Sequence, residues 1–121
     1  MYTFSFEKLE VWKKSRLYTK KIYSITQNFP ESEKFGMTNQ LRRAAISLCS
    51  NIAEGSSRNS KIDQKHFSNM AFSSLMETLN QLILSNDLDF INSSDLNECR
   101  TDIHIISLIL NNLSASLGRK S

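Results

Sequence analysis

The sequence has few residues that interrupt or cross-link a chain: one proline, three glycines and two cysteines among 121 residues. So few turn residues argue against a turn-rich β fold. A hydrophobic content of 40% is sufficient to form one buried core, which argues against a disordered chain. The longest apolar runs, such as Leu108-Ile109-Leu110, fall far short of the roughly 18 residues that span a bilayer. The sequence therefore predicts one domain over residues 1–121 and no transmembrane helix.

Targeting and redox signals are equally sparse. Residues 1–10 contain no apolar segment of the kind found in signal peptides, so secretion is not indicated. Cys49 and Cys99 are not spaced as a metal-binding pair, and we expect both to be reduced thiols of the core. Reduced cysteines predict a cytoplasmic protein.

Groups that carry catalysis are also missing. His66 and His104 fall on different expected helices, and no strained-turn motif surrounds a candidate serine. Asp63 and His66 have the i, i+3 spacing of a helical metal pair, but a di-metal bundle requires a second such repeat and two further glutamates. The chain also lacks a glycine-rich phosphate loop. We expect no catalytic residues, no metal site, no cofactor and no enzymatic activity.

Hydrophobic periodicity predicts four helices, over about residues 6–28, 39–54, 61–86 and 95–117. Pro30 ends the first helix, because proline cannot donate to the helical hydrogen-bond ladder. Thr38 is the expected N-cap of the second helix, and Gly55 is its expected C-terminal cap with a positive φ. Ser60 and Asp63 resemble a capping box that opens the third helix. Helices of this length joined by short loops predict an all-α, antiparallel up-down-up-down four-helix bundle.

The last of these helices has the most regular apolar pattern. Its stripe alternates in steps of three and four residues and consists of Leu96, Cys99, Ile103, Ile106, Leu110, Leu113 and Leu117. Ile105, Leu108 and Ile109 extend the apolar surface beyond that stripe. Because a monomeric bundle buries one stripe per helix, the surplus predicts an oligomer interface. A helix buried more deeply than its neighbours would show the same surplus, and the sequence does not separate the two explanations.

Charge is distributed unevenly along the chain. Residues 1–65 contain 12 Lys/Arg and 6 Asp/Glu, a net of +6, whereas residues 66–121 contain 3 and 6, a net of −3. The candidate nucleic-acid-binding residues are Lys13, Lys14, Lys20 and Lys21, at a seven-residue repeat opposite the expected core, together with Arg42, Arg43 and Arg58. Such a strip is able to contact phosphates and release their counterions. Lysines on the outside of a bundle commonly face only water, so the solvated explanation stays open.

Two polar flanks form a further feature of the middle helices. The first consists of Arg43, Ser47, Asn51 and Glu54, and the second of Ser73, Ser74, Glu77 and Gln81. Where such flanks meet, we expect a hydrogen-bonded lock in which Arg43 pairs with Glu77 or Glu54 and Asn51 takes part. This lock would fix helix register or subunit geometry. A groove for a ligand or nucleic acid is the alternative.

Several motifs resemble one known family over nearly the whole chain. They are Phe6-Glu-Lys-Leu-Glu-Val-Trp12, Ile22-Tyr-Ser-Ile-Thr26, Gln40-Leu-Arg-Arg-Ala-Ala-Ile-Ser47, Asn51-Ile-Ala-Glu-Gly55 and Ala71-Phe-Ser-Ser-Leu-Met-Glu77. They resemble the four-helix bundle protein family, also called the 23S rRNA intervening-sequence protein family. The resemblance implies an antiparallel four-helix bundle that assembles as a ring-shaped pentamer. It also implies a relationship to the accessory variability determinant proteins of diversity-generating retroelements, basic pentamers that bind a reverse transcriptase and nucleic acid.

Four positions depart from the pattern that this resemblance implies. Ser73 replaces a usual glycine, Ser15 a common alanine, and both Tyr18 and Thr78 replace leucine. Serine in place of glycine widens a close helix contact and affects the geometry of assembly.

Two functional hypotheses follow. The first is a homo-oligomeric bundle that binds RNA, or a nucleic-acid-bound protein, through the basic residues. The second is a protein-interaction scaffold without nucleic-acid binding, which acts through the surplus apolar face of the last helix.

Overall fold

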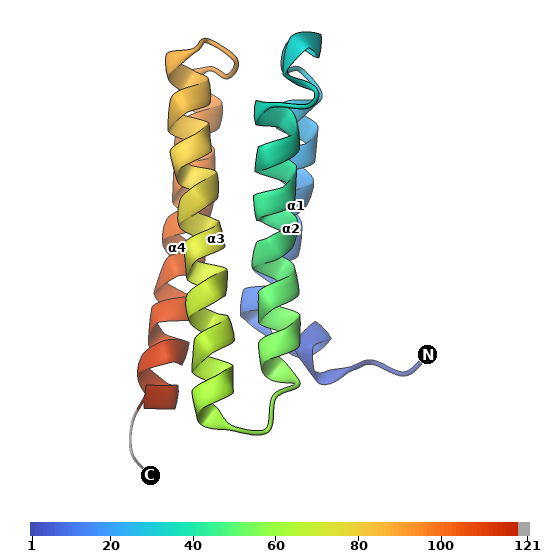
Figure 1. Ribbon diagram of the computed structural model, residues 1–121, viewed down its shortest axis with the longest axis vertical. Coiled ribbons are helices and arrows are strands. Elements are labelled where there is room, and N and C mark those ends of the chain that lie inside the picture. The colour runs from blue at the N-terminus through green and yellow to red at the C-terminus, as the bar shows by residue number, and fades with distance from the viewer. Residues whose placement is uncertain (119–121) are drawn as a thin grey trace.

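The computed structural model describes residues 1–118 and contains four long helices (Figure 1). They are α1 (Glu10–Thr26), α2 (Met37–Ser56), α3 (Lys61–Asp87) and α4 (Ser93–Gly118), and two 3-10 turns cover Ser5–Lys8 and Glu31–Glu33. Residues 1–118 contain no β-strand. The all-α class and the four predicted helices are therefore confirmed, with boundaries that differ by a few residues.

Figure 1 shows the four helices side by side, with residues 57–60 joining α2 to α3 at the lower end. Between α2 and α3, Gln40 is linked to Gln81 and Ser47 to Ser74, so residue numbers rise along one helix as they fall along the other. The connections between α1 and α2 and between α3 and α4 lie at the upper end of the view.

The core runs along the middle of the bundle and draws side chains from all four helices. Its fully buried large residues are Tyr18, Ile22, Leu41, Leu48, Leu75, Leu82, Ile106 and Leu110. The predicted stripe of α4 is buried from Leu96 to Leu110, whereas Leu113 is 38% exposed. Burial is incomplete there because Leu113 borders a cavity at the lower end of the bundle.

The helix ends confirm one predicted cap and correct another. Ser60 is the N-cap of α3, because its Oγ accepts a hydrogen bond from the Asp63 backbone N–H at 3.1 Å. The predicted N-cap of α2, Thr38, is wrong, because α2 begins at Met37 and Thr38 lies inside the helix. The Met37 N–H donates instead to Glu33 Oε1 at 3.0 Å, so a carboxylate from the preceding 3-10 turn caps this helix.

Gly55 does not have the role expected from its position. It lies inside α2 rather than after it, and no glycine among the described residues has a positive φ. The reason for glycine is proximity: a Cβ added here would lie 2.8 Å from the Cβ of Phe67 on α3. Gly55 therefore permits the close approach of α2 and α3 at the lower end of the bundle.

A left-handed residue ends α3. Asp89 has φ 62°, the Phe90 N–H donates to the Ser85 carbonyl at 2.8 Å, and the Asp89 N–H donates to the Asn86 carbonyl at 3.1 Å. This pair of bonds is a Schellman motif, in which glycine is the usual left-handed residue. Beyond it, the Asn92 Oδ1 accepts from the Asp95 N–H at 2.7 Å at the start of α4.

The first helix begins later than the predicted residue 6. Residues Ser5–Lys8 form a 3-10 turn, and α1 starts at Glu10. The Phe6 ring lies edge-on to Trp12 with a centroid distance of 5.0 Å. This aromatic contact turns the chain back on the start of α1 rather than continuing the helix.

Candidate nucleic-acid and self-association surfaces

Three of the four candidate lysines of α1 are exposed. Lys14 and Lys20 form no ion pair with any described residue. Lys13 lies 3.7 Å from Glu10 of its own helix, and both side chains are at least half exposed. An exposed pair of this kind is weak and is screened by salt. Lys13, Lys14 and Lys20 are therefore available to an external anion.

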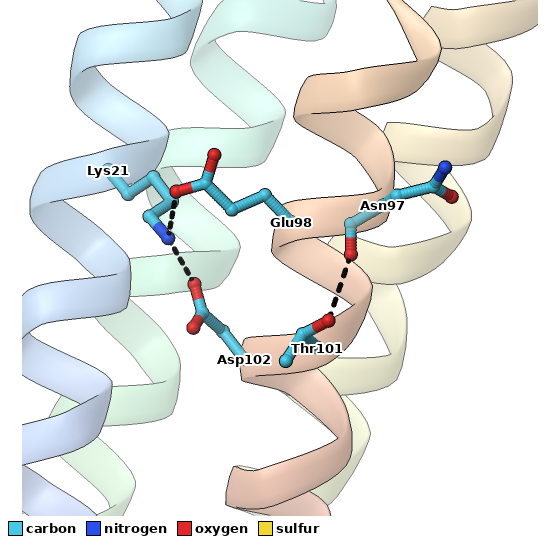
Figure 2. A network of polar contacts seen from close by, with 5 residues as sticks. All are labelled: Lys21, Asn97, Glu98, Thr101 and Asp102. Carbon is cyan, nitrogen blue, oxygen red and sulfur yellow. Dashed lines mark hydrogen bonds and ion pairs between the residues drawn. The ribbon is translucent and has the colours of Figure 1, made fainter.

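Lys21 is bound within the bundle instead. Figure 2 shows its side chain reaching from α1 to α4, where its Nζ lies 2.9 Å from Glu98 Oε1 and 2.6 Å from Asp102 Oδ2. The hydrogen bond that Lys21 donates to the Asp102 carboxylate is the main cause that raises the pKa of Lys21 above its ordinary value. The sequence placed Lys21 on the same outer strip as the other lysines, whereas in the structure it pairs with two carboxylates of a segment distant in sequence.

The three candidate arginines divide in the same way. Arg42 donates from Nε to Thr26 Oγ1 at 2.9 Å and lies 4.5 Å from the centroid of the Tyr23 ring, so it joins α2 to the end of α1. Arg43, its neighbour in sequence, is exposed and forms no ion pair with a described residue. Arg58 is exposed at the lower end, stacked 4.6 Å from the centroid of Phe67. Arg42 is thus a structural residue, whereas Arg43 and Arg58 face outward.

The polar flanks of α2 and α3 meet through residues of the predicted flanks, without the expected ion pair of Arg43. Ser47 Oγ lies 3.0 Å from Ser74 Oγ, Asn51 Nδ2 donates to the Ser47 carbonyl at 2.9 Å, and Gln81 Nε2 donates to Glu77 Oε2 at 3.1 Å. The expected ion pair of Arg43 with Glu77 or Glu54 is absent from residues 1–118, and Glu54 is exposed. The hydrogen bonds that cross between the two helices join neutral side chains, Ser47 with Ser74 and Gln81 with Gln40, whereas Glu77 accepts from Gln81 of its own helix.

A groove runs along the outer seam between α1 and α4 and has a volume of about 470 Å³. Half of its lining is apolar or aromatic (Leu17, Tyr18, Ile105 and Ile106) and half is charged (Lys14, Lys20, Lys21 and Asp102). Leu17 is 64% exposed and Ile105 is 40% exposed. Of the residues predicted as an oligomer interface, Leu108 is also exposed and Ile109 is half-buried against the core. The surplus apolar surface of α4 is therefore open rather than buried within the bundle.

A second cavity lies at the lower end of the bundle, and we call it the end cavity. Its volume is about 300 Å³, and all four helices contribute to its wall. The apolar lining consists of Leu9, Val11, Ile52, Ile109, Leu110, Leu113 and Leu117. The end cavity is thus bordered by the last two residues of the predicted stripe of α4, which explains why that stripe is only partly covered.

A buried hydroxyl pair crosses the core and was not predicted. Tyr18 Oη lies 2.8 Å from Thr78 Oγ1, and Thr78 Oγ1 donates to the Leu75 carbonyl at 2.6 Å. Burial raises the pKa of the Tyr18 phenol above its ordinary value, against the opposing effect of the Thr78 hydrogen bond. Tyr18 and Thr78 are both positions at which the family resemblance implies leucine. The sequence therefore indicated this contact by two polar residues at core positions where the resemblance implies leucine.

Reactive groups are dispersed in the described part of the chain. His66 is exposed beside Phe67 on α3, and His104 is exposed on α4. Within residues 1–118, no three His, Cys, Asp or Glu side chains gather as metal ligands would. Cys99 is fully buried, and burial raises the pKa of its thiol to about 12. The helices of residues 1–118 also lack an apolar stretch long enough to cross a membrane.

Comparison with known proteins places this bundle in a family. Residues 7–112 match the family described as 23S rRNA-intervening sequence protein. A solved structure from Bacteroides thetaiotaomicron, described as a protein with unknown function from the S23 ribosomal protein family, is similar at 25% identity with a TM-score of 0.77. The match covers 86% of this chain and 97% of that chain. No curated protein matches the sequence. The chain therefore belongs to the 23S rRNA-intervening sequence protein family.

Proposed function

We propose that the protein is a non-catalytic, homo-oligomeric, antiparallel up-down-up-down bundle that binds RNA, or a ribonucleoprotein, through its basic surface. The main support is that Lys13, Lys14 and Lys20 are exposed on α1 without a carboxylate partner on another helix. Such cations exchange their solvent shell for phosphates, and the counterions released drive association.

The geometry narrows the set of proposed RNA contacts. Lys21 and Arg42 are held by partners within the bundle, so the proposed contacts are Lys13, Lys14, Lys20, Arg43 and Arg58. The family takes its name from intervening sequences of 23S rRNA, which favours RNA over other polyanions as the partner.

Salt dependence of RNA binding tests this proposal. The triple variant Lys13→Gln, Lys14→Gln, Lys20→Gln should bind single-stranded RNA more weakly than the wild type at low salt. Since each phosphate contact contributes about 0.7 to the slope of log K against log salt, the triple variant should lower that slope by about 2. Fluorescence anisotropy over a salt series measures both quantities.

Two charge-matched controls come from the same chain. Lys34→Gln removes an exposed lysine that lies beside Glu31 and Glu33 in the connection between α1 and α2, away from the proposed surface. Arg42→Gln and Arg43→Gln compare adjacent arginines, of which only Arg43 faces outward. The slope should be unchanged for Lys34→Gln and should fall by less than one for Arg43→Gln. No binding by the wild type at low salt would eliminate the proposal.

The exposed seam between α1 and α4 supports self-association, because the exposed side chains of Leu17 and Ile105 line one groove, and Leu108 is exposed on the same helix as Ile105. We propose that the apolar part of this seam, around Leu17 and Ile105, lies between subunits in a ring of five, as the family resemblance implies, with Lys14 and Lys20 at its solvent-facing edge. Ile105→Asp should lower the mass of the assembly without changing the helical content, whereas Ser107→Asp on the same helix should leave it unchanged.

The same seam supports the second candidate function, a scaffold that binds proteins only. A wild type that assembles and never binds RNA would favour this function over RNA binding.

A further inference from the structure

We propose that residues 1–4, the N-terminal arm, insert aromatic side chains into the end cavity of a second copy of this chain. This inference rests on the self-association proposed above and assigns it a specific contact. The donor is the arm of one subunit, and the acceptor is the cavity formed by the four helices of its neighbour.

The arm exposes two aromatic rings. Tyr2 is 77% exposed and Phe4 is 61% exposed, and their ring centroids lie 4.9 Å apart in an edge-on arrangement. The rings contact each other, whereas the aromatic residue that follows them, Phe6, lies against Trp12 of the bundle. Adjacent exposed rings of this kind are typical of residues that anchor protein interfaces.

In the structure the arm is directed away from the cavity of its own subunit (Figure 1). The Phe4 N–H donates to Glu7 Oε2 at 2.7 Å, and the Glu7 N–H donates to the Phe4 carbonyl at 3.1 Å. This reciprocal pair fixes the chain at the start of the 3-10 turn. In Figure 1 the arm leaves the lower end beside α2 and points away from the C-terminal end of α4. The helix α4, however, contributes Ile109, Leu113 and Leu117 to the cavity wall.

The cavity and the arm match in size and chemistry. A cavity of about 150 Å³ is known to accommodate one benzene ring, so the end cavity of about 300 Å³ has space for the rings of the arm. Its wall is mostly leucine and isoleucine, and its polar groups include Asn51 and Gln64, which are suited to the Tyr2 hydroxyl.

The area of this contact is sufficient to contribute to a stable interface. Each aromatic side chain buries roughly 150–250 Å², and the cavity wall buries a similar area in return. Two rings therefore remove roughly 600–1,000 Å² from water, about half of the roughly 1,200–2,000 Å² that specific interfaces bury. Ile109 of the end cavity and Ile105 of the seam lie one helical turn apart on α4, so one partner can cover both.

Sedimentation velocity of matched variants tests the arm directly. The double variant Tyr2→Ser, Phe4→Ser should raise the dissociation constant of the assembly by at least about tenfold, while circular dichroism shows unchanged helicity. Phe35→Ser is the matched control, because Phe35 is 88% exposed in the connection between α1 and α2 at the other end of the bundle. Equal dissociation constants for the wild type and the double variant would overturn the inference.

A disulfide between arm and cavity identifies the site and the subunit. Phe4→Cys combined with Leu113→Cys, in a Cys49→Ser background that leaves only the buried Cys99, should give covalent multimers on a non-reducing gel. Phe35→Cys with Leu113→Cys should give none. A monomer with an internal disulfide would place the arm in its own cavity and would refute the exchange.

The outcomes separate this inference from the proposal on which it depends. An assembly that survives loss of the arm but dissociates with Ile105→Asp refutes the arm and keeps self-association through the seam. A wild type that is monomeric at all concentrations refutes both self-association and the proposed insertion of the arm. RNA binding is then tested separately by the salt dependence of its affinity.

Discussion

Removing the hydroxyl of Thr78 should destabilise the bundle more than removing the hydroxyl of Tyr18, although the two groups share one hydrogen bond. Thr78 Oγ1 already donates to the Leu75 carbonyl, so Tyr18 must be the donor in the 2.8 Å contact. In Tyr18→Phe, Thr78 keeps its own donation, and the loss is one ordinary hydrogen bond, about 1 kcal/mol. In Thr78→Val, the Tyr18 hydroxyl loses its acceptor at a position that is 1% exposed, which costs about 2 kcal/mol.

The double variant is the decisive member of this set. With both hydroxyls gone, no donor is left without an acceptor, so Tyr18→Phe with Thr78→Val should cost about 1 kcal/mol rather than the additive 3 kcal/mol. The coupling free energy is then about 2 kcal/mol. Tyr18→Ala, in contrast, removes the ring and should cost about 3–5 kcal/mol, because it opens a cavity in the core.

Urea unfolding followed by circular dichroism measures these free energies. All variants must be compared at one protein concentration, because self-association makes apparent stability depend on concentration. Equal m-values across the set would show that the same surface is exposed on unfolding. The reasoning fails if the two single effects add within about 0.5 kcal/mol, or if Thr78→Val is the milder change.

Four further expectations concern single residues. Ser15→Ala should stabilise the protein by about 1 kcal/mol in urea unfolding, since the buried Ser15 Oγ has no hydrogen-bond partner among residues 1–118. Asp89→Gly should stabilise it by about 0.5–1 kcal/mol, because the φ of 62° is costly for a residue with a side chain. Asp102→Asn should cost about 1 kcal/mol or less, and the cost should shrink in high salt, because Lys21 keeps its contact with the partly exposed Glu98. Burial raises the pKa of Cys99 to about 12, so unfolded chains lose this proton first as the pH increases. Stability should therefore fall between pH 9 and about 12, and Cys99→Ala should reduce that fall.

The fold was predictable because its signals are local. Apolar periodicity of 3.6 residues, Pro30 after α1 and the Ser60 cap before α3 each act within a few residues, and all are confirmed in placing the helices. The errors arose where a contact outside the helix itself decides which residue is needed. Glu33 rather than Thr38 caps α2, and Gly55 is needed for its distance to Phe67 rather than for a left-handed turn.

At the candidate site, too, features set by the periodicity of one helix were predicted, and features set by contacts between helices were not. The periodicity of α1 alone predicted that its lysines face outward. Lys13, Lys14 and Lys20 are exposed in the structure. That Lys21 instead pairs with Asp102, 81 residues later in the chain, depends on how α1 and α4 lie against each other. Single-helix periodicity contains no information on such a pairing. The same limitation applies to Arg42, whose partner is the end of the preceding helix.

Native mass spectrometry of the purified protein, with and without a ribosomal RNA fragment, measures self-association and RNA binding in one experiment. We expect assemblies of several 13.9 kDa subunits, and a further increase in mass equal to one RNA when the fragment is added at low salt. A single species at 13.9 kDa that is unchanged by RNA would contradict both expectations.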